Sequence, residues 1–537
     1  MRIAWLLLLL FGCPNAHLRS ERDAARSDAG TPDSAIEADA GPGADRPDAD
    51  RPAPAEDSLR LIAPLSGSTV RGRPALAVAA PRAQPFTVEV CRDTLCADVV
   101  WTAEGIGGES VARPSDLEKG MYFWRASSDD VQTPLWNFWV PLRSRRTAWE
   151  DTAYGAGGDL DGDGIGDLAY VLAGDVDEIH LVRSQSRERT LRVEASEQVS
   201  QLGRAGDLNG DGLGDLVVQT VRESRRRQPR AYWISGADPA LRLLADDTGF
   251  AVGLGDTNGD GYGDLLLSTV DGITLYFGSS EGPREARVLT ADSTGIGYAA
   301  GDVDGDQLAD WVVARPNATS DESSLRGQVD VFFGDRVRPG QEVRAIRPQD
   351  CGSYADTRCG VGLFVAAGGD VTGDGLAEIT VGSRGASWTF SFDGRTPLAP
   401  QTHGGGIAFD PSTRPRIAAV PRYVGDVNGD GLDELVAVRA VDSDFDGVVE
   451  ESSLLVYTSY GFPWREGDAI WRDIPFDEHH YGDFAQAGDL NGDGWLDFVA
   501  TLRSERESAI GVHYGGGRPV VRELLRGPVG TGAVLAH

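Results

Sequence analysis

One acidic loop recurs seven times along the C-terminal three-quarters of the chain. The first copy, residues 159–167, reads Asp-Leu-Asp-Gly-Asp-Gly-Ile-Gly-Asp. The other copies begin at Asp207, Asp256, Asp302, Asp370, Asp426 and Asp489. Counting the first Asp as position 1, oxygen-bearing side chains recur at positions 1, 3, 5 and 9. Calcium takes about six to eight oxygen ligands, and a loop folded around one point supplies them from alternate residues. The pattern therefore predicts a calcium site in each copy.

Each loop offers a complete set of candidate ligands. Positions 1, 3 and 5 supply side-chain oxygens, position 7 can turn its backbone carbonyl inward, and position 9 closes the shell with one or both carboxylate oxygens. Glycine at positions 4 and 6 lets the backbone take positive φ. The candidate ligands are Asp159, Asp161, Asp163, Ile165, Asp167, Asp207, Asn209, Asp211, Leu213, Asp215, Asp256, Asn258, Asp260, Tyr262, Asp264, Asp302, Asp304, Asp306, Leu308, Asp310, Asp370, Thr372, Asp374, Leu376, Glu378, Asp426, Asn428, Asp430, Leu432, Glu434, Asp489, Asn491, Asp493, Trp495 and Asp497.

An ordinary hairpin turn is the competing interpretation, because Asn-Gly and Asp-Gly are common in such turns. A plain turn does not need acids at positions 1, 5 and 9 in every copy, and clustered carboxylates without a cation repel one another. We therefore favour calcium. The copies are not equal, since Thr372 offers a neutral hydroxyl at position 3 and Gln307 replaces glycine at position 6. We expect the loops that begin at Asp302 and Asp370 to be the weaker sites.

An eighth acidic segment, residues 442–450, lies outside the repeated pattern. Its acids are Asp442, Asp444, Asp446 and Glu450. Their spacing suits calcium, and it suits a solvated acidic turn equally well. We expect seven calcium sites, and we leave open whether this segment forms an eighth.

Short apolar runs flank each loop and predict a β-hairpin with the metal at its tip. A third strand follows in most repeats and ends in an aromatic-Gly pair, as at Phe277-Gly278 and Phe333-Gly334. A fourth, polar strand leads into the next repeat. Successive loops start 48, 49, 46, 68, 56 and 63 residues apart. Seven repeats of four antiparallel strands predict an all-β, seven-bladed β-propeller.

These features resemble FG-GAP/VCBS repeats over about residues 144–537. The resemblance rests on the aromatic-Gly pairs, the strand 484–488 that ends in glycine, and the Asp-x-Asn-Gly-Asp-Gly-x-x-Asp loops. Such repeats form the propeller at the head of integrin α subunits. The resemblance implies calcium loops on one face of the disc and partner binding on the opposite face. Every repeat here carries a loop, unlike integrins, and neither an inserted adhesion domain nor a transmembrane helix is visible, so the integrin mechanism is not carried over.

The N-terminal segment indicates export. Residues 1–12 have the short apolar stretch of a signal peptide, and their end resembles a bacterial lipoprotein processing box in which Cys13 is lipidated. Phe11 is not the usual small residue there, so conventional cleavage a few residues later remains an alternative. Residues 13–57 then predict a disordered tether rich in Asp, Ala and Pro.

The cysteine count agrees with an oxidising compartment. Five cysteines leave two close pairs once Cys13 is set aside, Cys91 with Cys96 and Cys351 with Cys359, and we expect a local disulfide in each.

Residues 58–143 change to alternating apolar runs, as at 86–90, which indicate half-buried strands. The run 120–125 is similar to the penultimate strand of fibronectin type III-like sandwiches. We expect such a β-sandwich, acting as a spacer; a binding role is the alternative.

A net charge of −33 argues against nucleic acid and anionic lipid surfaces as partners. We expect a monomeric surface protein, held to the bacterial envelope by its lipid, in the outer membrane or at the cell surface. Its expected partner is a surface protein or polysaccharide, and we expect no enzymatic activity. One alternative is a calcium-dependent carbohydrate-active enzyme, and another is a structural envelope protein without a specific ligand. The enzyme would draw on His403, His479, His480, Trp464 and Trp471, which form no recognisable catalytic motif.

Overall fold

The computed structural model describes a large part of residues 59–535 and assigns only β-strands as regular elements there. The described ranges are 59–70, 72–80, 85–107, 110–114, 117–129, 131–140, 158–172, 174–183, 189–193, 197–222, 228–269, 271–290, 295–321, 324–325, 327–346, 360–383, 387–403, 416–428, 432–442, 451–457, 469–471, 480–493, 495–503, 508–516, 521–526 and 533–535. Within these ranges, no helix is long and apolar enough to cross a membrane. The protein is all-β over the residues described.

The N-terminal strands form two sheets. The smaller contains β1 (Arg60–Ala63), β3 (Leu76–Ala79) and β6 (Ser110–Ala112). The larger has the order β2 (Ser68–Thr69), β8 (Trp136–Val140), β7 (Gly120–Ser127), β4 (Phe86–Cys91) and β5 (Val99–Ile106). Alternate residues of β4 point inward, so Phe86, Val88 and Val90 join one core with Trp124 and Trp136. This alternation is what a sheet with one buried face requires.

Seven further sheets in the described residues have four antiparallel strands each, and they are separate from one another. In sheet order, the first comprises β11 (Arg189–Arg192), β10 (Glu178–Val182), β9 (Leu168–Leu172) and β40 (Ala533–Leu535). The second comprises β12 (Glu197–Gly206), β13 (Asp215–Arg222), β14 (Gln228–Ile234) and β15 (Arg242–Asp246). The third comprises β16 (Ala251–Gly255), β17 (Asp264–Thr269), β18 (Gly272–Phe277) and β19 (Arg284–Thr290). The fourth comprises β20 (Ile296–Gly301), β21 (Asp310–Arg315), β24 (Gln328–Phe332) and β25 (Val343–Ile346).

The remaining sheets follow the same plan. The fifth comprises β26 (Phe364–Gly369), β27 (Glu378–Gly382), β28 (Ser387–Phe390) and β31 (Gln401–His403). The sixth comprises β32 (Arg416–Tyr423), β33 (Leu435–Asp442), β34 (Glu451–Tyr457) and β35 (Ala469–Trp471). The seventh comprises β36 (His480–Gly488), β37 (Asp497–Arg503), β38 (Ser508–His513) and β39 (Val521–Arg526). Two small hairpins pair β22 (Thr319–Asp321) with β23 (Ser324–Leu325) and β29 (Phe392–Asp393) with β30 (Thr396–Pro397).

The second strand of a repeat is buried on both faces, which explains its unbroken apolar run. In β17, Leu265 and Leu267 pack with Val217 of the preceding sheet, whereas Leu266 packs with Trp311 of the following sheet. A strand covered on both sides loses the alternation of polar and apolar residues. Neighbouring sheets therefore share their apolar faces.

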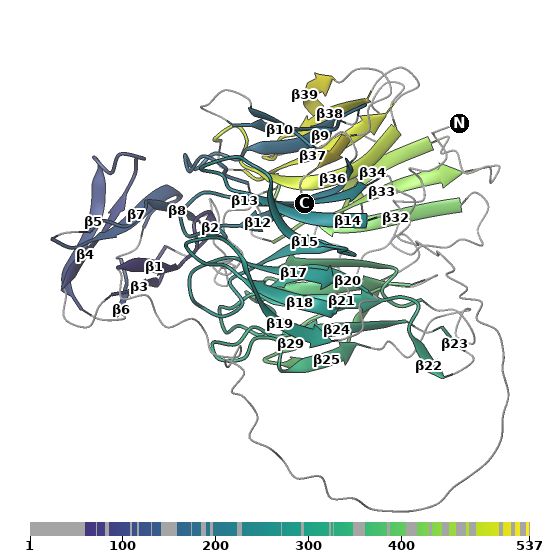
Figure 1. The fold of residues 1–537 in the computed structure, drawn as a ribbon, viewed down its shortest axis with the longest axis horizontal. Coiled ribbons are helices and arrows are strands. Elements are labelled where there is room, and N and C mark those ends of the chain that lie inside the picture. The colour runs from purple at the N-terminus through teal and green to yellow at the C-terminus, as the bar shows by residue number, and fades with distance from the viewer. Residues whose placement is uncertain are drawn as a thin grey trace, which may run out of the picture.

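The C-terminal strand returns to the first of these sheets. Strand β40 pairs antiparallel with β9, with Val534 opposite Val171. Along the chain, β12 contacts β16, β16 contacts β20, β20 contacts β26 and β26 contacts β32. Figure 1 shows the two N-terminal sheets projecting from one side of this larger assembly.

Candidate metal sites

Six of the acidic loops connect the first two strands of their sheets, and the first loop, residues 159–167, leads directly into β9. The carboxylate at position 1 organises the turn, as the first loop shows. The amides of Gly162 and Gly164 donate to the two oxygens of Asp159 over 2.6 and 2.8 Å. Both glycines have positive φ, +77° and +84°, which a side chain would disfavour. Gln307 takes the same left-handed conformation in the fourth loop, at φ +69°. A residue with a side chain therefore has the left-handed backbone conformation that favours glycine.

The carboxylate at position 9 has a structural role that the sequence did not predict. Asp264 accepts the amide of Thr257, at position 2, over 2.9 Å and the amide of Gly278, at the end of β18, over 3.0 Å. Corresponding pairs of bonds are made by Asp215, Asp310 and Asp497. Position 9 thus ties the loop to the third strand, in addition to any ligand it offers to a cation.

The glycine of the aromatic-Gly pair is required by close packing. A Cβ on Gly278 would lie 2.3 Å from the carbonyl oxygen of Gly263 in its own loop and 2.8 Å from that of Leu208 in the preceding loop. No side chain fits between these two carbonyls. The glycine therefore lets one repeat contact the loop of the repeat before it.

Backbone hydrogen bonds link the loops head to tail. The amide at position 8 donates to the position-1 carbonyl of the preceding loop. The pairs are Gly214 to Asp159, Gly263 to Asp207, Ala309 to Asp256, Ala377 to Asp302 and Asp433 to Asp370, over 2.7–3.0 Å. The seventh repeat joins the sixth loop through Gly516 and the carbonyl of Val427, over 2.9 Å. Gly166 of the first loop donates to Asp489 of the seventh over 2.7 Å, so the last repeat is also linked to the first.

The acidic side chains converge as a cation would require. Asp159, Asp161 and Asp167 each offer one oxygen, all within 4.8 Å of one another, and the same holds for Asp302, Asp304 and Asp306 and for Asp370, Asp374 and Glu378. Ligands of this type and spacing could hold a calcium ion in the first, fourth and fifth loops.

Burial raises the pKa of several of the loop carboxyls. The pKa of Asp159 rises to about 6 through burial, and the nearby charge of Asp163 adds to the shift. Burial, with the charge of Asp211, raises the pKa of Asp207 to about 7. Burial, with the charges of Asp370 and Asp374, raises the pKa of Glu378 to about 8. A bound divalent cation would favour the ionised forms and oppose these shifts.

The N-terminal sheets cover the second and third loops. Ser66 Oγ donates to the carbonyl of Gly212 over 2.8 Å. The guanidinium of Arg60 lies over the ring of Tyr262, 5.0 Å from its centroid, and donates to the carbonyl of Asp260. A cavity of about 160 Å³ at this junction is lined by Arg60 and Tyr262 together with Trp136. The N-terminal strands that the structure describes therefore form part of the surroundings of these loops.

Several predicted residues lie outside the described part of the chain. These are Cys13, Cys351, Cys359, Asp430, Asp444, Asp446, Glu450, Trp464 and His479, together with the side chains of His403, Asp442, Trp471 and His480. The structure joins Cys91 to Cys96 as a disulfide. The sequence did not indicate which residues from elsewhere in the fold reach the loops, among them Asn137 at the first loop and Arg395 at the fourth. The Asp393-Gly394 pair signals a turn next to Arg395, but nothing local indicates which loop that turn meets.

Comparisons with known proteins do not assign the chain to a family. No family model matches the chain, and no curated protein matches it. Among solved structures, the chain is similar to the Bacillus licheniformis rhamnogalacturonan lyase PL11, with 13% sequence identity and a TM-score of 0.26, over 88% of this chain and 77% of that one. A likeness at this TM-score carries no argument about the site or its chemistry.

Proposed function

We propose that the seven four-stranded sheets are the blades of a calcium-binding β-propeller of the FG-GAP/VCBS type. The observation that carries the proposal is the head-to-tail bonding of the acidic loops, which returns from the seventh loop to the first. The pairing of β40 with β9 supports it, because the last strand then completes the first blade. Radial packing of this kind leaves only short, protected strand edges.

Calcium in this proposal stabilises the fold. At about 1 mM calcium and dissociation constants of about 10–100 μM, each filled site would add about 1.4–2.7 kcal/mol. Several such sites together are comparable to the whole stability of a domain, which is about 5–15 kcal/mol. Their convergent, buried carboxylates are unfavourable without a cation, which is why the loops would depend on it.

The biological role that we propose is binding at the cell surface. Residues 1–12 would direct export, lipidated Cys13 and the tether to residue 57 would hold the chain to the envelope, the sandwich of residues 58–143 would act as a spacer, and the propeller of residues 144–537 would contact a surface protein or polysaccharide. The N-terminal sheets occupy the loop side at the second and third loops. The opposite side of the propeller is therefore the proposed binding face.

The test compares the full chain, solubilised in detergent, in millimolar calcium and after calcium removal. We expect calcium to raise the melting temperature, and purified envelope polysaccharides and proteins to bind only in its presence. The matched variants are Asp211→Ala, in the second loop, and Asp246→Ala, at the exposed end of β15, where only the first should lower the calcium response. A melting temperature that is the same with and without calcium would refute the proposed metal sites. Sugar release from a polysaccharide would favour the enzyme alternative.

A further inference from the structure

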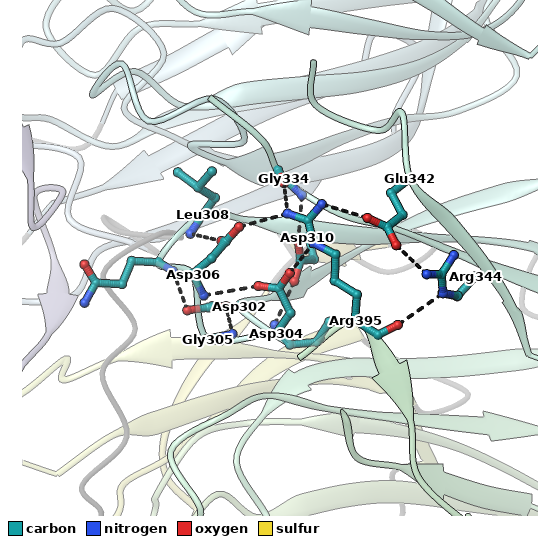
Figure 2. Close-up of polar contacts among 12 residues, drawn as sticks. Asp302, Asp304, Gly305, Asp306, Leu308, Asp310, Gly334, Glu342, Arg344 and Arg395 are labelled. Atoms are coloured by element: carbon teal, nitrogen blue, oxygen red, sulfur yellow. Dashed lines mark hydrogen bonds and ion pairs between the residues drawn. The ribbon is translucent and has the colours of Figure 1, made fainter. Parts of the chain in front are cut away.

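An arginine from the fifth repeat enters the fourth acidic loop. Arg395 Nε lies 2.7 Å from Asp304 Oδ2, and its terminal nitrogen Nη2 lies 3.1 Å from Asp306 Oδ2. Figure 2 shows the guanidinium bridging the acids at positions 3 and 5 of this loop. A planar guanidinium that binds two carboxylates has a defined position as well as a charge.

The same side chain is held on its other sides. Its Nη1 lies 3.1 Å from Glu342 Oε2, and Nη2 donates to the carbonyl of Gly334 over 3.0 Å. The guanidinium also lies over the ring of Phe333, 5.3 Å from its centroid. Phe333 packs edge-on against Phe392, which belongs to the hairpin that carries Arg395. These contacts place the cation firmly against the loop.

The second and seventh loops bridge the same two positions with the side-chain amide of an asparagine. Position 3 is Asn209 in the second loop, and its amide donates to Asp211 over 2.9 Å. Asn491 makes the same bond to Asp493 over 3.0 Å. The fourth loop has an acid at position 3, and its side chain is only 4% exposed. Two facing carboxylates repel unless a cation lies between them, and Arg395 provides that cation.

We propose that Arg395 takes the place of calcium in the fourth loop, so that this copy is closed by a cation belonging to the chain. The inference rests on the proposed calcium function of the remaining loops. A divalent ion here would need the oxygens of Asp304 and Asp306 that already bind the guanidinium, and it would be repelled by its positive charge. Gln307, left-handed where the first loop has glycine, makes the turn less adaptable as well.

The decisive measurement is the number of calcium ions bound per full-length chain, by equilibrium dialysis. The wild type should bind one ion fewer than it has loops. Asp304→Ala should leave that number unchanged, whereas Asp211→Ala in the second loop should lower it by one. Arg395→Ala should raise it by one, and adding Asp304→Ala to that variant should remove the gain. Arg336→Ala is the matched control, since Arg336 donates to a backbone carbonyl, that of Gly259 in the third loop.

The outcomes distinguish the proposed role of Arg395 from the proposed calcium binding by the other loops. A wild type that binds no calcium would refute the proposed function itself. Loss of one ion in Asp304→Ala, or no gain in Arg395→Ala, would overturn the role of Arg395 while leaving the other sites standing. If Arg395→Ala fails to fold, the comparison of Asp304→Ala with Asp211→Ala still decides the question.

Discussion

The side-chain amide of Asn137 donates a hydrogen bond to Asp159 Oδ2 over 2.7 Å, and both residues are buried. Asn137 belongs to β8 of the N-terminal sheets, whereas Asp159 opens the first acidic loop. The same oxygen accepts the amide of Gly164. The first loop is therefore organised partly by a residue outside the repeats. Calcium binding at this loop would then be coupled to the packing of the N-terminal sheets against it.

Asn137→Ala should lower the stability of the protein by about 1–3 kcal/mol, because it leaves a buried carboxylate with one donor fewer. Asn137→Asp should destabilise the calcium-free protein further, because it places a second acid beside Asp159. Urea denaturation with and without calcium measures both effects. Gln132→Ala, an exposed change near the start of β8, is the control and should have no effect. Equal stability of Asn137→Ala and the control would refute the coupling.

Thr372→Asn should tighten calcium binding in the fifth loop. Thr372 Oγ1 lies 3.2 Å from Glu378 Oε1, and an asparagine would bring a carbonyl oxygen to position 3, as in the second loop. Isothermal titration should show a gain in affinity at one site, with an unchanged number of ions. An unaltered titration would contradict the ranking of this loop as weak because of its threonine.

Gly278→Ala should destabilise the third repeat by about 1–3 kcal/mol, since the new methyl group would meet two backbone carbonyls that cannot both move. The control is Gly107→Ala, where a Cβ would meet no atom within 4 Å. Thermal unfolding compares the two variants. If both melt alike, the close contact between neighbouring loops is not what selects glycine there.

The calcium-free protein should become less stable as the pH rises. Asp207 and Glu378 have folded-state pKa values of about 7 and about 8, above the ordinary values of 3.8 and 4.5. The folded state therefore binds more protons than the unfolded state, so this contribution to stability is complete below pH 3.8 and is lost as the pH rises through about 8. Calcium should reduce the loss, because it replaces the protons.

Melting temperatures measured from pH 5 to pH 8, in calcium-free and calcium-loaded protein, check this dependence. The two curves should diverge toward pH 8. Parallel curves would show that calcium and protons do not compete for the same carboxylates.

The sequence by itself determined the loops and the strands next to them. The candidate ligands, the glycines and the turn that the glycines allow all lie within nine residues, as in residues 159–167. The apolar run of a strand such as β17 follows each loop directly. Interactions between residues this close in the chain depend on their spacing, which can be read directly from the sequence.

Only the tertiary structure decided what surrounds each loop. Arg395 and Asp304 are hydrogen-bonded although they lie 91 positions apart in the chain. Asn137 belongs to an N-terminal sheet, and it donates to Asp159 in the first acidic loop. Oδ1 of Asp264 accepts the amide of Gly278, which follows β18 directly and is placed there by the pairing of β18 with β17. Such partners are chosen by how separate sheets pack, because a side chain binds whatever the fold brings within about 3 Å, and no local pattern records that distance.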